Sequence, residues 1–124
     1  MNDSDLNVIK DIVEKAVVFA FAKYGFPRPN LCIAHHKSPS PDDTEIWKDY
    51  WEEHHPSHHF PSEPHICPSC LMIQDDFVGG HLVIEDQTFI VPVCRVCNST
   101  YKGEKADGHF FYVREQDMVR APED

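Results

Sequence analysis

Apolar residues recur at intervals of three and four positions from Asp5 to Tyr24, a pattern that places them on one stripe of an α-helix. The stripe holds Leu6, Ile9, Ile12, Val13, Ala16, Val17, Ala20, Phe21 and Tyr24. Ser4 or Asp5 is suited to cap the free amides at the start of the helix. Gly25 followed by Pro27 is suited to end it.

The apolar face of this helix has two interpretations. We expect the stripe to dock on the core of the domain, as amphipathic helices usually do. Val18 and Phe19 widen the face beyond a simple stripe. This width keeps open a second interpretation, in which the helix forms a dimer or binds a partner.

Residues 25–65 hold most of the prolines and seven of the nine histidines, so we expect this stretch to be mostly irregular. Within it, Asp42-Asp43-Thr44 precedes an aromatic stripe, which predicts a short capped helix that ends before Pro56. The stripe consists of Ile46, Trp47, Tyr50 and Trp51. We expect these aromatic side chains to pack on the long helix rather than to stack on a ligand.

Short apolar runs follow the first cysteine pair. Residues 81–84 and 88–91 are separated by polar Glu85-Asp86-Gln87, which predicts a β-hairpin. Residues 98–105 predict a short helix, Gly108 ends it, and residues 109–114 predict a further strand. We therefore expect one α+β domain over residues 1–124. In it, an N-terminal helix and an irregular Pro/His-rich layer (residues 1–65) pack on a C-terminal part (residues 66–124).

The charge of the chain narrows the classes of partner. The chain of 124 residues has 11 Lys and Arg and 21 Asp and Glu, which gives it a formal net charge of −10. Because this charge repels phosphate, the protein is not expected to coat nucleic acid through bulk electrostatics. A basic or polar partner suits this charge better. No run approaches the roughly 18 apolar residues of a membrane span, and the chain opens with polar residues rather than with a targeting segment. We expect a cytoplasmic protein that does not bind a membrane.

Four of the five cysteines form two identical pairs, Cys67-x-x-Cys70 and Cys94-x-x-Cys97, separated by 23 residues. This doubled spacing is typical of a structural zinc site, in which four thiolates complete a closed tetrahedron. Paired disulfides or a redox pair are the alternatives, and a reducing compartment disfavours the first. We expect Cys32 to be a buried structural thiol.

Residues 66–105 carry further motifs: Cys67-Pro-Ser-Cys70, then Gly79-Gly80-His81-Leu82-Val83, then a second pair that ends in Cys97-Asn98, followed by Lys102. This arrangement resembles the zinc-bound treble clef of HNH endonucleases. The resemblance implies a zinc knuckle, a β-hairpin and a helix. It also implies that His81 stands at the position of the general base, and Asn98 at that of a ligand to a catalytic divalent ion.

The chain also departs from the HNH pattern. The residue before the base is normally an acid or a histidine that binds the catalytic ion, and here it is Gly80. The asparagine that orients the base has no clear counterpart, and Asp75 or Asp76 could replace the missing ligand only if their loop folds back. Because cleavage of a phosphodiester needs both a base and a hard cation, the sequence indicates an HNH scaffold with a degraded site.

A histidine-rich segment precedes the first cysteine pair. Residues 51–65 offer five imidazoles and three carboxylates, a composition that can bind zinc, copper or nickel. His58, His59 and His65 are the candidate ligands of a second metal site, and adventitious binding is the alternative. The same segment could also lend ligands to the hairpin.

Two functions follow from these patterns. The first is a zinc-scaffolded, non-catalytic recognition module that acts on a protein or a nucleic-acid-associated partner. By analogy, it could be an inhibitor in a phage or bacterial conflict system. The second is a metal-dependent endonuclease of the HNH type, with His81 as general base.

Overall fold

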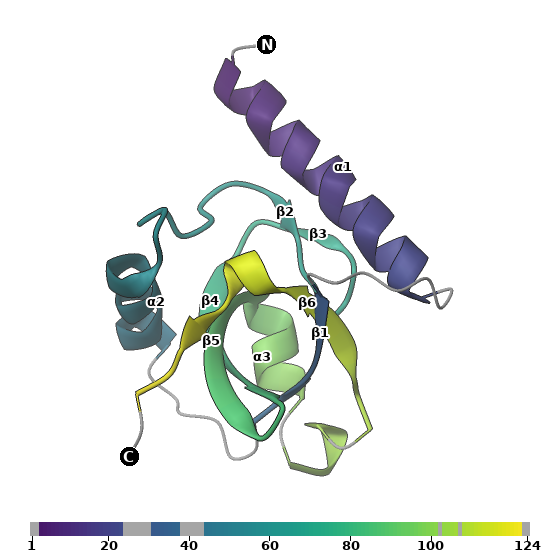
Figure 1. Ribbon diagram of the computed structural model, residues 1–124, viewed down its shortest axis with the longest axis vertical. Coiled ribbons are helices and arrows are strands. Elements are labelled where there is room, and N and C mark those ends of the chain that lie inside the picture. The colour runs from purple at the N-terminus through teal and green to yellow at the C-terminus, as the bar shows by residue number, and fades with distance from the viewer. Residues whose placement is uncertain (1–2, 24–30, 38–43, 102, 107, 123–124) are drawn as a thin grey trace.

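The computed structural model describes residues 3–23, 31–37, 44–101, 103–106 and 108–122 and has a mixed α+β architecture (Figure 1). Its elements, in chain order, are α1 (Asp3–Lys23), β1 (Leu31–His36), α2 (Thr44–His54), β2 (His65–Ile66), β3 (Ile73–Gln74), β4 (Phe77–Ile84), β5 (Gln87–Cys94), α3 (Arg95–Thr100), the 3₁₀ turn η1 (Gly103–Ala106), β6 (Phe111–Arg114), the 3₁₀ turn η2 (Glu115–Asp117) and β7 (Val119–Arg120). None of the helices in these ranges is long and apolar enough to cross a membrane.

An antiparallel five-stranded sheet, in the order β6-β1-β4-β5-β7, organises the fold. Its strands curve around α3 in the view of Figure 1. Almost every side chain of β4 is buried. Such continuous burial means that both faces of the strand are covered, and α2 and α3 both contact β4.

The predicted hairpin is confirmed and is longer than expected. β4 and β5 pair along their whole length, from Phe77 opposite Cys94 to Ile84 opposite Gln87. Glu85 and Asp86 alone form the turn, with φ of 51° and 63°. Two residues in the left-handed region are typical of a type I′ turn, whose twist matches that of the flanking strands.

The prediction that residues 25–65 are mostly irregular is wrong for β1. This strand pairs with β6, from Leu31 opposite Arg114 to Ala34 opposite Phe111, and with β4 through His35 opposite Val83. Both partner strands lie far away in the sequence, so no local pattern reveals the pairing. Strand β1 therefore ties the N-terminal part of the chain into the same sheet as the C-terminal part.

The aromatic residues of α2 pack on the sheet and not, as expected, on α1. Helix α2 lies against β4 and β5. Trp51 is buried and donates a hydrogen bond from Nε1 to the carbonyl oxygen of Asp117, 3.0 Å away. The hydroxyl of Tyr50 donates to the carbonyl oxygen of Arg120 at 3.3 Å. The helix thus holds the end of the chain against the sheet.

Helix α1 is confirmed, but its apolar stripe does not dock on the core. The helix begins at Asp3 and so already includes both predicted caps, while the predicted stop signals lie outside the described residues. It contacts the rest of the protein mainly at β2. Lys15 is buried at this contact, whereas Leu6, Ile9, Val13 and Val17 are exposed.

The elements after β5 agree with the expected order. In place of the single helix predicted over residues 98–105, the structure has two elements: α3, which starts earlier and ends at Thr100, and the separate 3₁₀ turn η1. Gly108 follows with φ of 81°, and β6 occupies the last four residues of the predicted strand.

Candidate metal centre

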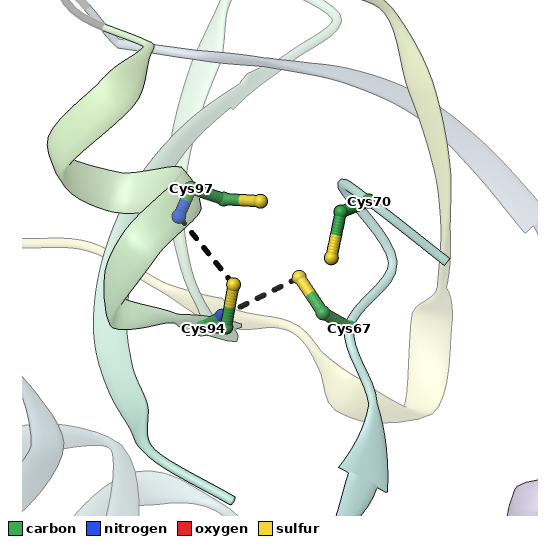
Figure 2. A group of neighbouring side chains, drawn as sticks. All are labelled: Cys67, Cys70, Cys94 and Cys97. Carbon is green, nitrogen blue, oxygen red and sulfur yellow. Dashed lines mark hydrogen bonds between the residues drawn. The ribbon is translucent and has the colours of Figure 1, made fainter. Parts of the chain in front are cut away.

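The first cysteine pair lies in a tight turn between β2 and β3. These strands pair His65 with Gln74 and Ile66 with Ile73. The amide of Leu71 donates to the carbonyl oxygen of Cys67 at 2.8 Å, and Leu71 adopts φ of 61°. This reversal turns the sulfurs of Cys67 and Cys70 toward the same point (Figure 2).

The second pair joins β5 to α3. Cys94 is the last residue of β5 and also the N-cap of α3. Its sulfur accepts a hydrogen bond from the amide of Cys97 at 3.4 Å, and this bond fixes the first turn of the helix. The end of a strand and the start of a helix therefore place the two sulfurs side by side.

The four cysteine sulfurs lie within 4.8 Å of one another. Figure 2 shows the four side chains gathered around one point. Tetrahedral zinc, with Zn–S distances of about 2.3 Å, needs sulfurs separated by about 3.8 Å, which is close to this spacing. All four cysteines are free thiols. Cys67, Cys94 and Cys97 are buried and Cys70 is partly buried. The group could hold a metal ion such as zinc.

The electrostatics of the thiols favour a bound cation. Burial raises the pKa of Cys67 to about 12, and it also raises the pKa of Cys97. Burial acts in the same direction on Cys70, but hydrogen bonds, first from the Met72 backbone, outweigh it and lower the pKa of this thiol. Two buried thiols that resist ionisation need a compensating positive charge to become ligands, and a divalent metal supplies it.

A group of stacked aromatic rings contacts Ser69, which lies between the two cysteines of the first pair. The hydroxyl of Ser69, between Cys67 and Cys70, lies 2.9 Å from Nε2 of His36 and 3.0 Å from Nε2 of His109. A hydrogen bond from Ser69 opposes the rise in the pKa of Cys97, so this serine links the imidazoles to a ligand. The rings of Tyr101 and His109 stack with centroids 3.8 Å apart.

This second layer was not predicted from the sequence, because the two imidazoles lie 33 and 40 positions from Ser69. The only signal was the place of Ser69 between two candidate ligands. Burial, followed by the charge of His109 and then His35, lowers the pKa of His36 to about 4. Its neutral ring suits a supporting role beside thiolates.

His81 lies on the α2 face of the sheet. Its ring stands edge-on to Trp47, with centroids 4.4 Å apart, and is buried. Burial lowers its pKa to about 4, and the positive charge of Lys37 acts in the same direction. Gly79 shares this face, because a Cβ atom there would lie 2.7 Å from the backbone carbonyl carbon of Trp47.

Asn98 belongs to α3, which covers the opposite face of β4. A Cβ atom on Gly80 would meet Oδ1 of Asn98 at 3.4 Å and Cγ2 of Val93 at 2.5 Å. Because successive residues of a strand point to opposite faces, His81 and Asn98 are separated by the sheet itself. The structure does not bring the two proposed catalytic residues together. It also leaves no room at position 80 for the side chain of a metal ligand.

The three histidines proposed for a second metal site do not form one group. Nδ1 of His58 lies 2.8 Å from the carbonyl oxygen of Glu52. Nε2 of His59 and Nε2 of His65 each lie 3.9 Å from the same carboxylate oxygen of Glu63, and Nδ1 of His65 lies 3.2 Å from Asp11. Across the described ranges, only the four cysteines form a group of metal-binding size.

The two acids proposed as substitute ligands have other roles. A carboxylate oxygen of Asp76 accepts a hydrogen bond from Nε of Arg95 at 2.9 Å, and Asp75 is exposed.

Comparison with protein-family models, with curated proteins and with solved structures finds no match to this chain. The function therefore has to follow from the chemistry of its own residues.

Exposed apolar side chains adjoin the cysteines along the chain. Leu71, Met72 and Ile73 follow the first pair, and Val96 lies between the two cysteines of the second. Each of these four side chains is exposed, from 46% for Leu71 to 67% for Val96. We call these four residues the knuckle surface.

Proposed function

We propose that residues 65–100 form a zinc-bound treble clef and that the protein is a non-catalytic recognition module which binds a protein partner through the knuckle surface. The single observation that carries the proposal is the placement of His81 and Asn98 on opposite faces of the hairpin, with Gly80 packed against Val93 between them.

Zinc fits the cluster better than other metals. Four thiolates in a tetrahedron are the ligands of a closed structural zinc site, which keeps no open position for substrate. A reducing compartment such as the cytoplasm would keep these thiols free. In this proposal the metal holds the two knuckles in place, and the chemistry of binding belongs to the surface that they present.

The surroundings of His81 argue against phosphodiester cleavage. A general base for this reaction has to reach a water molecule beside a hard cation that neutralises the leaving oxygen. His81 is instead buried against Trp47, and Lys37 adds a positive charge beside it. A depressed pKa further weakens His81 as a base at neutral pH.

The knuckle surface favours a protein over a nucleic acid. It is apolar, and the acids Asp75 and Asp76 lie next to it in the chain. Arg95, the cation beside the second pair, bonds to Asp76 and approaches Glu45 at 3.9 Å. The whole chain carries a net charge of −10. An apolar surface on such an acidic protein suits a partner whose own apolar side chains are surrounded by basic ones. A nucleic-acid enzyme that the protein inhibits belongs to this class.

A cleavage assay tests the non-catalytic part of the proposal. The zinc-loaded protein is incubated with plasmid DNA and with RNA in Mg²⁺, Mn²⁺ or Ni²⁺, beside the His81→Ala variant. We expect no cleavage by either protein. Metal-dependent nicking that His81→Ala abolishes would overturn the proposal in favour of an HNH endonuclease.

A capture experiment tests the binding surface. The tagged protein is used to enrich partners from a cell extract, beside Met72→Glu/Val96→Glu and the control Ile33→Glu, which places a charge on an exposed aliphatic position of β1. We expect the double variant to lose partners that the control retains. Identical captured sets from all three proteins would refute the role of the knuckle surface.

A further inference from the structure

Helix α1 is attached to the rest of the protein through its charged face. The carboxylate of Asp11 lies 3.2 Å from Nη1 of Arg114 and 3.2 Å from Nδ1 of His65. Lys15, one turn further, is 8% exposed and lies 3.5 Å from Asp11. These four residues line a cavity of about 290 Å³ beneath the helix.

The opposite face of α1 is apolar and open to solvent. Leu6, Ile9, Val13 and Val17 keep 43%, 45%, 55% and 44% of their surface exposed. At 100° per residue, these four positions form one stripe, about half a turn away from Asp11 and Lys15. Monomeric proteins rarely leave such a continuous apolar stripe uncovered, so this face is suited to a partner.

We propose that this face pairs with the same face of α1 in a second copy, in an antiparallel two-fold arrangement. The spacing supports the pairing, because Leu6 and Val13, like Ile9 and Ala16, lie seven residues apart, as core positions of a coiled coil do. An antiparallel register sets Ile9 opposite Val13 and Leu6 opposite Ala16. Leu6, Ile9 and Val13 each then meet an apolar side chain, as the centre of a two-fold interface requires, while Val17 lies toward its end.

The charges beside the stripe are also self-complementary. Lys10 and Glu14 flank the same side of it, and both are exposed. Glu14 lies 3.7 Å from Arg114 but keeps 62% of its side chain exposed. The two-fold register brings Lys10 of each copy near Glu14 of the other. A helix aimed at a basic partner would instead present one sign of charge.

The proposal is independent of the knuckle surface and predicts a distinct salt dependence. Two copies that each carry −10 repel one another, and salt screens this repulsion. Self-association through α1 therefore strengthens as salt rises. Binding of a basic partner to the acidic protein weakens under the same conditions.

Sedimentation of the zinc-loaded full chain, from about 1 to about 500 µM and in about 0.05 and 0.5 M NaCl, tests the dimer. We expect a dimer that tightens in the higher salt. Ile9→Glu and Val13→Lys should each weaken it by roughly tenfold or more, because each puts a charge among aliphatic side chains. Ile46→Glu, a charge at an exposed isoleucine of α2, should leave it unchanged.

A combined variant tests the orientation. In the antiparallel register, Ile9→Glu with Val13→Lys in one chain sets Glu against Lys twice, so dimerisation should recover relative to either single variant. A parallel pair would set like charges together and show no recovery. Circular dichroism and zinc content confirm that each variant is folded. The proposal would be overturned if the wild-type protein stayed monomeric at every protein and salt concentration. It would also be overturned if the control Ile46→Glu lost the dimer while Ile9→Glu and Val13→Lys kept it.

Discussion

The sulfur of Cys67 accepts a hydrogen bond from the backbone amide of Cys94, 3.4 Å away and 27 positions later in the chain. This bond joins the turn after β2 to the start of α3. The amide stabilises a thiolate more than a thiol, because a hydrogen bond to the charged form favours that form. Metal binding and the docking of the two knuckles are therefore coupled.

Removal of the metal should unfold this region. Structural zinc contributes roughly 10–16 kcal/mol of apparent binding free energy, which is comparable to or larger than the usual net stability of a domain. We expect one zinc per chain by elemental analysis. A chelator should abolish the protection of the amides of Cys67, Leu71 and Cys97 in hydrogen exchange. Cys94→Ser should lose the metal, whereas Cys32→Ser, outside the cluster, should keep it. An unchanged melting temperature after chelation would contradict this.

Restoring an acid at position 80 should not create a nuclease. In Gly80→Asp, the Cβ atom would start 2.5 Å from Val93, so we expect a loss of about 1–3 kcal/mol of unfolding free energy from overpacking. In the control Gly108→Asp, a Cβ atom has nothing within 4 Å, so no overpacking arises. We expect this variant to lose only about 1 kcal/mol of unfolding free energy, because φ of 81° is unfavourable for a residue with a Cβ atom. Urea unfolding in the presence of zinc measures the unfolding free energy of both variants. A Gly80→Asp protein that is stable and cleaves DNA in Mg²⁺ would disprove this interpretation.

Acid should destabilise the protein through His81. Burial lowers its pKa to about 4 from the usual value of about 6.5, so the unfolded chain takes up a proton first as pH falls. The stability due to the neutral ring is complete above about pH 6.5 and is lost toward pH 4. His81→Phe should reduce the loss of unfolding free energy between pH 7 and pH 5 by roughly 1–2 kcal/mol. His59→Phe, at an exposed ring, should show the wild-type loss.

The turn of the hairpin offers a stabilising substitution. Glu85 and Asp86 both have positive φ, a conformation that Asn-Gly adopts at a lower cost. Replacing the pair with Asn-Gly should raise the unfolding free energy by about 0.5–1 kcal/mol. Glu85→Gln with Asp86 retained removes a charge without easing the backbone, so it should give little gain. Equal gains in both variants would assign the effect to charge.

The cluster of four cysteines was predictable because its pattern is local. Two residues between the cysteines of each pair are enough to direct both sulfurs to one side, whatever surrounds them. The hairpin of β4 and β5 was predictable for a similar reason, since two apolar runs and the polar turn between them lie within one short stretch. Only its length was underestimated, because Gly79 and Gly80 carry no hydrophobic signal.

The failures share a different physical origin. Strand β1 and the network of His36, Ser69 and His109 depend on partners far away in the chain. The apolar stripe of α1 predicted a core contact, but ion pairs of Asp11 with Arg114 and His65 turn the helix the other way. The resemblance to HNH endonucleases rested on the types and spacing of residues along the chain. It did not predict that strand alternation separates His81 from Asn98.

The pairing of β1 with β6 has a consequence for synthesis. Leu31 lies opposite Arg114 in the sheet, so β1 emerges from the ribosome well before β6, the strand with which it pairs. At roughly 5–20 residues per second, this delay lasts for several seconds. A message truncated before residue 111 would release a chain in which residues Leu31–Ala34 of β1 lack their partner strand, and this exposed edge would be prone to aggregate.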